Sequence, residues 1–348
     1  MNTARNGNRW QVQGIGKQKS MNKFILRQSM ILFMAAAVWG VAFVAQSVGM
    51  DYVGPFTFVA VRNVVALAVL VPCAVVMDNN RKKREKQERM HPKENKKALA
   101  IGGICCGICL FAASTLQQFG VKYTTVGKAG FITAMYIVLV PVFGIFLKKR
   151  TGLKVWAAVV LALLGLYFLC ITKGDFQLQK GDIYVLGCAA VFAIHILVVD
   201  YFSPRVDGVK LSCVQTLTNA VLGAVMMLLF EQPHLSEILA AWLPILYAGA
   251  LSSGVGYTFQ IIGQKGMNPT AASLILSLES VISVLAGWLI LHQSLTAREF
   301  AGCALAFAAI ILVQLPGRAQ KKKTTSFYYI VVTVFFKIIE IFRKISYN

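Results

Sequence analysis

The stretch 274-LILSLESVISVLAGWLIL-291 is almost continuously apolar over eighteen residues and carries one acidic residue, Glu279, near its middle. A run of about 20 apolar residues is long enough to cross a lipid bilayer as a helix. An ionised carboxylate in such a setting costs several kcal/mol unless it is paired, hydrated or protonated. The stretch therefore predicts a membrane-spanning helix whose glutamate faces a polar interior rather than lipid.

The composition of the whole chain is typical of a membrane protein. Of its 348 residues, 57% are hydrophobic and 14% are charged, whereas soluble domains contain about 25% charged residues. The formal net charge of +21 comes from basic residues between apolar runs. We find no DNA-binding or RNA-binding signature, so we expect no nucleic-acid partner. The C-x-x-C at Cys106 and Cys109 lies inside an apolar run beside two glycines, which favours helix packing over a metal or cofactor site.

Ten apolar runs are candidates for spanning helices. Pro55 after Gly54, and the pair Asn268-Pro269, are typical helix starts. The first run is too long for a signal-peptide core, so we expect it to be retained. The sequence predicts an all-α integral membrane protein with transmembrane helices at about residues 29–50, 54–77, 98–121, 123–147, 153–172, 182–202, 211–231, 241–264, 269–291 and 297–315.

The basic residues between these runs predict the orientation in the membrane. Alternate segments on one side hold 26 lysines and arginines, and the opposite segments hold 4. Because basic loops stay in the cytoplasm, we expect both termini to be cytoplasmic in a multi-pass protein of the cell membrane. The basic loop 78–97 is expected to be solvated or to lie against lipid headgroups, with an anionic-lipid site as the alternative. The short apolar run 327–342 is interpreted as an amphipathic or interfacial helix, with an eleventh span as the alternative.

The two halves of the chain can be aligned with each other. Without gaps, 120-GVKYTTVGKAGFITAMYIVLVPVFGIFL-147 aligns with 263-GQKGMNPTAASLILSLESVISVLAGWLIL-291, and 35-AAAVWG-40 aligns with 188-CAAVFA-193. The chain thus divides into two five-span units. Since five is odd, the second unit enters the membrane from the opposite side, and such inverted repeats are typical of secondary transporters. The expected domains are a basic N-terminal arm (1–27), repeat 1 (28–172), repeat 2 (182–316) and a basic, hydrophobic C-terminal tail (317–348).

Four stretches resemble one family. They are 37-AVWGVAFV-44, 57-TFVAVRNVVALAV-69, 123-YTTVGKAGFITAMYIVLVPV-142 and 277-SLESVISVLAGWLILHQSLTAREFAGCALAFAAIIL-312. Together they are similar to the ten-span, EamA-type members of the drug/metabolite transporter superfamily, over about residues 28–316. The sequence departs from that family at His292-Gln293, where Gly-Glu is frequent. The resemblance implies movement of metabolites or amino acids, commonly export, and it does not identify the substrate.

Ionisable residues within spans are candidates for function. Glu279 is interpreted as a cavity-lining carboxylate that binds a cationic group or carries a proton, with a fixed helix contact as the alternative. Lys128 either anchors a substrate carboxylate, pairs with Glu279 or extends to the headgroups. Arg62 either contacts substrate or ties helices together. His195 is more typical of a bundle histidine than of a proton relay. Polar and aromatic residues that add to the candidate site are Trp39, Tyr136, Tyr257, Gln260 and Gln117.

These features favour a secondary active transporter that moves a small polar metabolite, such as an amino acid, by alternating access. We expect a small-molecule substrate and membrane lipids as partners, no metal and no cofactor, with proton coupling left open. The alternative is a membrane receptor, channel or lipid-handling scaffold without turnover. An intramembrane enzyme is disfavoured because the four histidines are scattered and the sequence holds no H-E-x-x-H pair or paired intramembrane aspartates. The sequence leaves the direction, coupling ion and oligomeric state undetermined.

Overall fold

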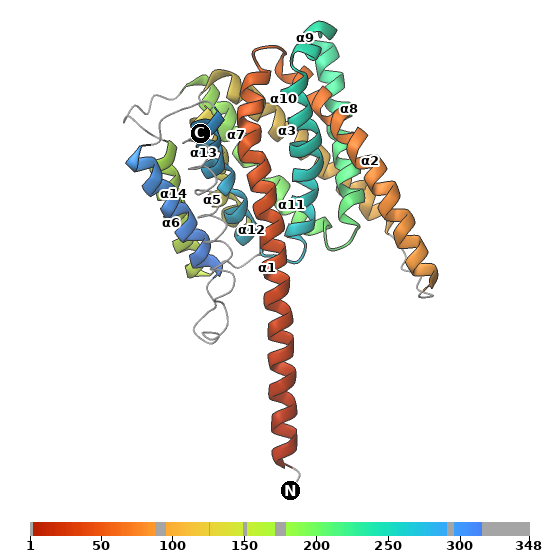
Figure 1. Ribbon diagram of the computed structural model, residues 1–348, viewed down its shortest axis with the longest axis vertical. Coiled ribbons are helices and arrows are strands. Elements are labelled where there is room, and N and C mark those ends of the chain that lie inside the picture. The colour runs from red at the N-terminus through yellow and green to blue at the C-terminus, as the bar shows by residue number, and fades with distance from the viewer. Residues whose placement is uncertain are drawn as a thin grey trace, which may run out of the picture.

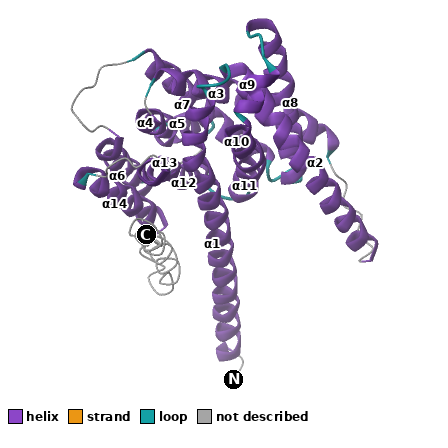
Figure 2. Cartoon of the chain, turned by 45° about the horizontal axis from the view of Figure 1, so that its top comes forward, coloured by secondary structure: helices purple, strands orange, loops and turns teal. Residues whose placement is uncertain are grey.

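The computed structural model describes residues 3–87, 95–124, 126–148, 152–170, 179–290 and 296–314, with most side chains from residue 23 onward. Within these ranges the chain is helical apart from short turns and loops (Figures 1 and 2). The predicted C-terminal tail, 317–348, lies outside the described residues. The helices are α1 (Thr3–Gly49), α2 (Pro55–Gln87), α3 (Lys96–Tyr123), α4 (Val126–Ala134), α5 (Tyr136–Phe146), α6 (Leu153–Cys170), α7 (Lys180–Phe202), α8 (Gly208–Phe230), α9 (Leu235–Ala240), α10 (Trp242–Leu246), the π-helix η1 (Tyr247–Gly256), α11 (Tyr257–Gln264), α12 (Pro269–Leu276), α13 (Leu278–Ile290) and α14 (Ala297–Gln314).

Eight helical segments in the described part are long and apolar enough to cross a membrane. They correspond to predicted spans one to four and six to nine. The fifth and tenth predicted spans are shorter apolar helices, Leu153–Phe168 and Phe300–Ala309, which belong to the neighbouring helices α6 and α14. The all-helical membrane class is therefore confirmed, and the count of ten depends on this pair.

Three helical features differ from the sequence expectation. Helix α1 begins at Thr3 and projects far beyond the bundle (Figure 1), whereas only 29–50 was predicted as helix. The fourth span contains Pro141, a residue type that often kinks helices, but the span is interrupted earlier, at Met135, and α5 continues through Pro141. The eighth span contains a π-helix of ten residues, which the apolar pattern gave no reason to expect.

The fourth and ninth spans are interrupted at nearly equivalent places. Met135 separates α4 from α5, and Ser277 separates α12 from α13. Asn268 starts the ninth span by accepting hydrogen bonds from the backbone N–H groups of Thr270 and Ala271, as its sequence predicts. At each interruption the chain makes a tight turn, because the N–H of Val138 donates to the oxygen of Met135 and the N–H of Ser280 donates to that of Ser277.

Helix contacts that involve one repeat have an equivalent in the other repeat. Helix α3 packs on α7 and α8, and correspondingly η1 and α11 pack on α1 and α2. A side chain on Gly120 of α3 would strike Val185 of α7, and one on Gly263 of α11 would strike Leu32 of α1. These four residues form matched pairs in the two alignments, so the contacts are related by the internal repeat. The face that carries the start of α8 also carries the beginning of the α1 span and the ends of α2 and α11, and we call it the amino-terminal face.

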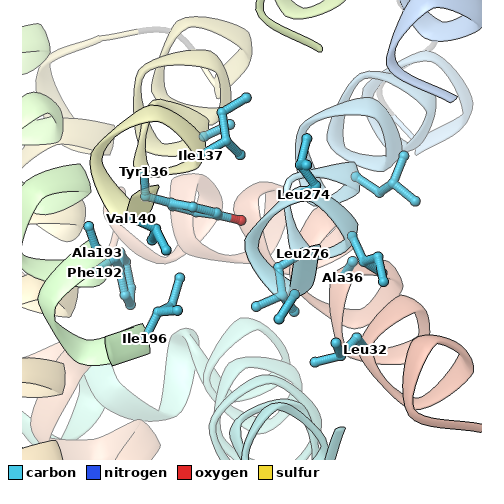
Figure 3. Close-up of a cluster of buried hydrophobic side chains, with 14 of the residues drawn as sticks. Leu32, Ala36, Tyr136, Ile137, Val140, Phe192, Ala193, Ile196, Leu274 and Leu276 are labelled. Carbon is cyan, nitrogen blue, oxygen red and sulfur yellow. The ribbon is translucent and has the colours of Figure 1, made fainter. Parts of the chain in front are cut away.

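A large apolar core lies where the two repeats meet. It joins Leu32 and Ala36 of α1, the α5 side chains around Tyr136, and Leu274 and Leu276 of α12 (Figure 3). Figure 3 shows the Tyr136 ring directed from α5 toward the segment of α12 and α13. The core therefore positions one phenol hydroxyl from repeat 1 against repeat 2.

Candidate functional site

A cavity lies between the two repeats, next to this core. It contains about 440 Å³ of space not filled by atoms, counted together with the open space that it reaches. Its wall combines a carboxylate, a guanidinium, several amides and several aromatic rings. The lining residues are Trp39, Phe43, Gln46, Arg62, Gln117, Tyr136, Phe192, Ile196, Ser252, Tyr257, Gln260, Leu276 and Glu279.

Glu279 supplies the carboxylate of the cavity. Its side chain is 4% exposed, and the hydroxyl of Tyr136 donates a hydrogen bond of 3.0 Å to its Oε1. It lies in the first turn of α13, directly after the interruption at Ser277. A helix N-terminus favours negative charge, so the interruption helps to accommodate this carboxylate in an apolar bundle.

Arg62 supplies the guanidinium. It is 2% exposed, its Nη1 donates to Oε1 of Gln46 at 3.4 Å, and its Cζ lies 5.8 Å from the centre of the Phe58 ring. Its Nε and Nη2 have no hydrogen-bond partner among the residues that the structure describes. Burying an unpaired cation is costly, so these donors indicate a site for an acceptor that the chain itself does not provide.

Arg62 and Glu279 line the same cavity without pairing with each other. Both residues are described, and the ion pairs within four ångströms lie elsewhere, on α2 and at the start of α8. Gln260, which also lines the cavity, has an unpartnered side-chain oxygen. The cavity thus presents a cation with free donors, a buried carboxylate and one free amide oxygen.

Aromatic rings form the remaining wall. Trp39 packs on Tyr257 with ring centroids 4.8 Å apart, and its Nε1 donates to the backbone oxygen of Ser252 in η1 at 3.2 Å. Gly256, the last residue of η1, leaves the space that the indole occupies. π-Helical segments are frequent at functional sites, and here η1 provides both the carbonyl and the gap for Trp39.

His195 lies behind this wall rather than in it. It is fully buried, its Nε2 is 3.2 Å from Oε1 of Gln215, and its ring meets the edges of Phe192 and Tyr257. Gln117 lines the cavity and donates to Oγ1 of Thr133 at 3.4 Å. Gln117 and Gln260 also correspond to each other in the alignment of the two halves, so each repeat contributes one amide of this matched pair.

The structure brings seven of the nine predicted site residues around this one cavity: Glu279, Arg62, Trp39, Tyr136, Tyr257, Gln260 and Gln117. His195 contacts the wall from behind, and the side chain of Lys128 lies outside the described residues. The prediction did not include Phe192 and Ile196. The alignment of 35-AAAVWG-40 with 188-CAAVFA-193 could have identified both, because in that register they correspond to Trp39 and Phe43. Across the described part, no group of three or more His, Cys, Asp and Glu side chains could hold a metal ion.

Comparison with known proteins identifies the family. The profile of the EamA-like transporter family matches residues 27–171 and again 179–315. An uncharacterized transporter of Archaeoglobus fulgidus is 28% identical over 82% of this chain and 84% of its own length. The uncharacterized transporter YoaV of Bacillus subtilis is 24% identical over 79% of this chain and 92% of its own. A crystal structure with 20% identity has the same fold, with a TM-score of 0.66 over 83% of this chain and 98% of the other. The chain therefore belongs to the EamA-like transporter family, and it is a multi-pass membrane transporter rather than an enzyme.

Proposed function

We propose that this protein is a secondary transporter that moves a small zwitterionic metabolite, such as an amino acid or a related compound, by alternating access. One observation carries the proposal: Arg62 and Glu279 line the same buried cavity and do not neutralise each other. A ligand with one negative and one positive group would satisfy both side chains at once.

The two charges would bind opposite ends of such a ligand. The free Nε and Nη2 of Arg62 suit a carboxylate, which a guanidinium binds with two parallel hydrogen bonds. The carboxylate of Glu279 and the free oxygen of Gln260 suit an ammonium group. The rings of Trp39 and Tyr257 offer an apolar surface between them and can also attract a cation.

The inverted repeats support alternating access. The cavity lies between the repeats and is lined by both of them, which is the arrangement that lets a rocking motion expose one site to each side in turn. We place the amino-terminal face in the cytoplasm of the cell membrane, because the basic residues are concentrated in the segments of that face. The expected direction is export, as the family resemblance implies.

Coupling to protons is part of the proposal. A carboxylate that loses its cationic ligand in an apolar bundle is costly unless it gains a proton. Glu279 would therefore hold either the ammonium group of the substrate or a proton. Exchange of the one for the other would drive export with the inward proton gradient.

The test is flux in proteoliposomes. Purified protein is reconstituted with a mixture of amino acids and small metabolites, a pH gradient is imposed, and the compounds that cross are identified by mass spectrometry. We expect selective, gradient-dependent flux that is lost in both Glu279→Gln and Arg62→Gln. The control is Glu237→Gln, which neutralises an exposed carboxylate on α9 and should transport normally.

The result also separates the alternatives. Flux that persists at the normal rate in both cavity variants would contradict the proposed site. Ion conductance without saturable solute flux would support a channel instead. A folded protein that moves none of the compounds, with or without a gradient, would favour a scaffold without turnover.

A further inference from the structure

Helices α2 and α8 pack against each other in antiparallel directions, and we call this contact the seam. The backbone oxygen of Leu70 in α2 accepts a weak hydrogen bond from the thiol of Cys213 in α8, at 3.8 Å. Nearer the opposite face, a Cβ on Gly223 of α8 would lie only 3.2 Å from the Cα of Ala60 in α2. In the register that pairs Trp39 with Phe192, Ala60 corresponds to Cys213 and Leu70 to Gly223. The two contacts are therefore equivalent, because the internal repeat relates one to the other.

A carboxylate closes this seam at the face opposite the amino terminus. Glu231 follows the end of α8 and accepts three hydrogen bonds from the start of α2. The donors are the backbone N–H groups of Phe56, at 3.0 Å, and Thr57, at 2.7 Å, and the Thr57 hydroxyl, at 2.6 Å. These N–H groups have no partner within their own helix, so Glu231 provides the N-terminal cap of α2 from another span. Gly54 makes room for it, because a Cβ there would strike the carboxylate.

A second carboxylate closes the seam at the amino-terminal face. Asp78, near the end of α2, accepts from Nζ of Lys210 in the first turn of α8 at 2.7 Å, and from Nζ of Lys82 at 2.7 Å. Beside it, Arg81 of α2 lies 3.4 Å from Asp207. Asp207 in turn caps α8 by accepting from the N–H groups of Val209 and Lys210.

These two closures are equivalent by the internal repeat. In the register that aligns the two halves of the seam, Asp78 corresponds to Glu231, and Lys210 corresponds to Thr57. The second span of each repeat thus ends in a carboxylate. This carboxylate binds the beginning of the second span of the other repeat. A rocking motion about the middle of the seam brings its two ends together in alternation. When one face of the cavity closes, the carboxylate contact at the opposite face must therefore lengthen.

We propose that Asp78 and Glu231 are a pair of gate latches, one for each face of the transporter. The Glu231 latch opens when the cavity faces the side opposite the amino terminus. The Asp78 latch opens when the cavity faces the amino-terminal side. The proposal rests on the proposed alternating-access function, but it makes a separate claim about which contacts set the balance between the two states.

The experiment measures access to the cavity from each side and needs no knowledge of the substrate. A reporter cysteine replaces Ser252, which lines the cavity, in a chain whose native cysteines are replaced. A membrane-impermeant maleimide is applied to right-side-out or inside-out vesicles, and the ratio of the two labelling rates is measured. Glu231→Gln should move this ratio about tenfold toward the face opposite the amino terminus, since charged hydrogen bonds are lost there. Asp78→Asn should move it a similar amount toward the amino-terminal face.

Two further variants keep the test decisive if a carboxylate substitution impairs folding. Gly54→Ala should displace Glu231 without removing its charge and should shift the ratio in the same direction as Glu231→Gln. Exchanging the partners in Asp78→Lys with Lys210→Asp should return the ratio toward that of the unaltered chain. Glu237→Gln serves as the control on the Glu231 face and should leave the ratio unchanged.

The latch assignment is overturned if the two carboxylate variants shift the ratio in the same direction, or if neither shifts it. That failure is distinct from failure of the proposed function. A chain that labels equally fast from both sides in every variant would have no alternating cavity at all. A chain that alternates without responding to either latch would keep the transport proposal and lose only this one.

Discussion

The Tyr136 hydroxyl lies 3.0 Å from Oε1 of Glu279, although the two residues occupy the same position in different repeats, 143 residues apart. In a two-fold arrangement, equivalent side chains can touch only if both lie close to the axis that relates the repeats. The bond therefore places this pair at the centre of the pseudosymmetric bundle. A neighbouring bond, from Oγ of Ser280 to the backbone oxygen of Gly130 at 2.6 Å, joins the same two spans.

Removing the Tyr136 hydroxyl tests how far Glu279 depends on this bond. Tyr136→Phe keeps the ring in the core and leaves the buried carboxylate with one donor fewer, so we expect a loss of about 1 to 3 kcal/mol in the free energy of unfolding. Flux should fall less than in Glu279→Gln. Thermal unfolding in detergent and flux measurements on both single variants and on the double variant would show the coupling. Strictly additive effects would argue against a functional pair.

The charge of Glu279 should control the response to pH. If Glu279 exchanges a proton for the substrate, Glu279→Gln abolishes the acceleration of flux by an imposed pH gradient. A counterflow assay with substrate on both sides separates this effect from binding. Exchange that continues in the variant, but no longer responds to the gradient, would identify coupling as the lost step. An intact response to the gradient would show that another group carries the proton.

The sequence predicted the general architecture because apolar length, basic loops and internal alignment each report on topology directly. It also predicted most of the cavity wall, because a polar or aromatic side chain in an apolar span usually faces the interior of the helix bundle. The alignment that paired Tyr136 with Glu279 needed no coordinates. It could not show that the pair is bonded, since that depends on how near both residues lie to the axis.

Other features could not have been predicted from this one sequence. Within the π-helix η1, Gly249 packs closely against α2, and such a tertiary contact leaves no mark in the apolar pattern of the sequence. Glu231 lies in a polar segment that is typical of any loop, and its role follows only from the position of the α2 N-terminus. The sequence favours a bundle histidine at His195, but it could not identify the partner of the ring, which is Oε1 of Gln215.

Arg62 gives a prediction in which stability and function separate. Arg62→Met removes a buried guanidinium with two unpartnered donors and keeps much of its apolar stem. Replacing an uncompensated buried charge by an apolar side chain is often neutral or stabilising. We therefore expect the melting temperature in detergent to stay the same or rise, while flux is lost. A large fall in melting temperature would show instead that the bond to Gln46 and the contact with Phe58 make Arg62 a structural residue.

The matched glycines Gly120 and Gly263 test the internal repeat itself. Alanine at either position would press a methyl group into the partner helix, against Val185 in one case and Leu32 in the other. Crowding of this kind typically costs about 1 to 3 kcal/mol. Because the two contacts are equivalent, we expect Gly120→Ala and Gly263→Ala to lower the melting temperature by similar amounts.

The control for this pair is Gly152→Ala, at a glycine whose added methyl group would meet no atom within 4 Å. It should leave the melting temperature nearly unchanged. A difference between the two matched variants as large as the effect of either one would show that the repeats pack differently at their two faces. In that case the two gates would differ in stiffness, and access should favour the face whose glycine contact tolerates the extra methyl group.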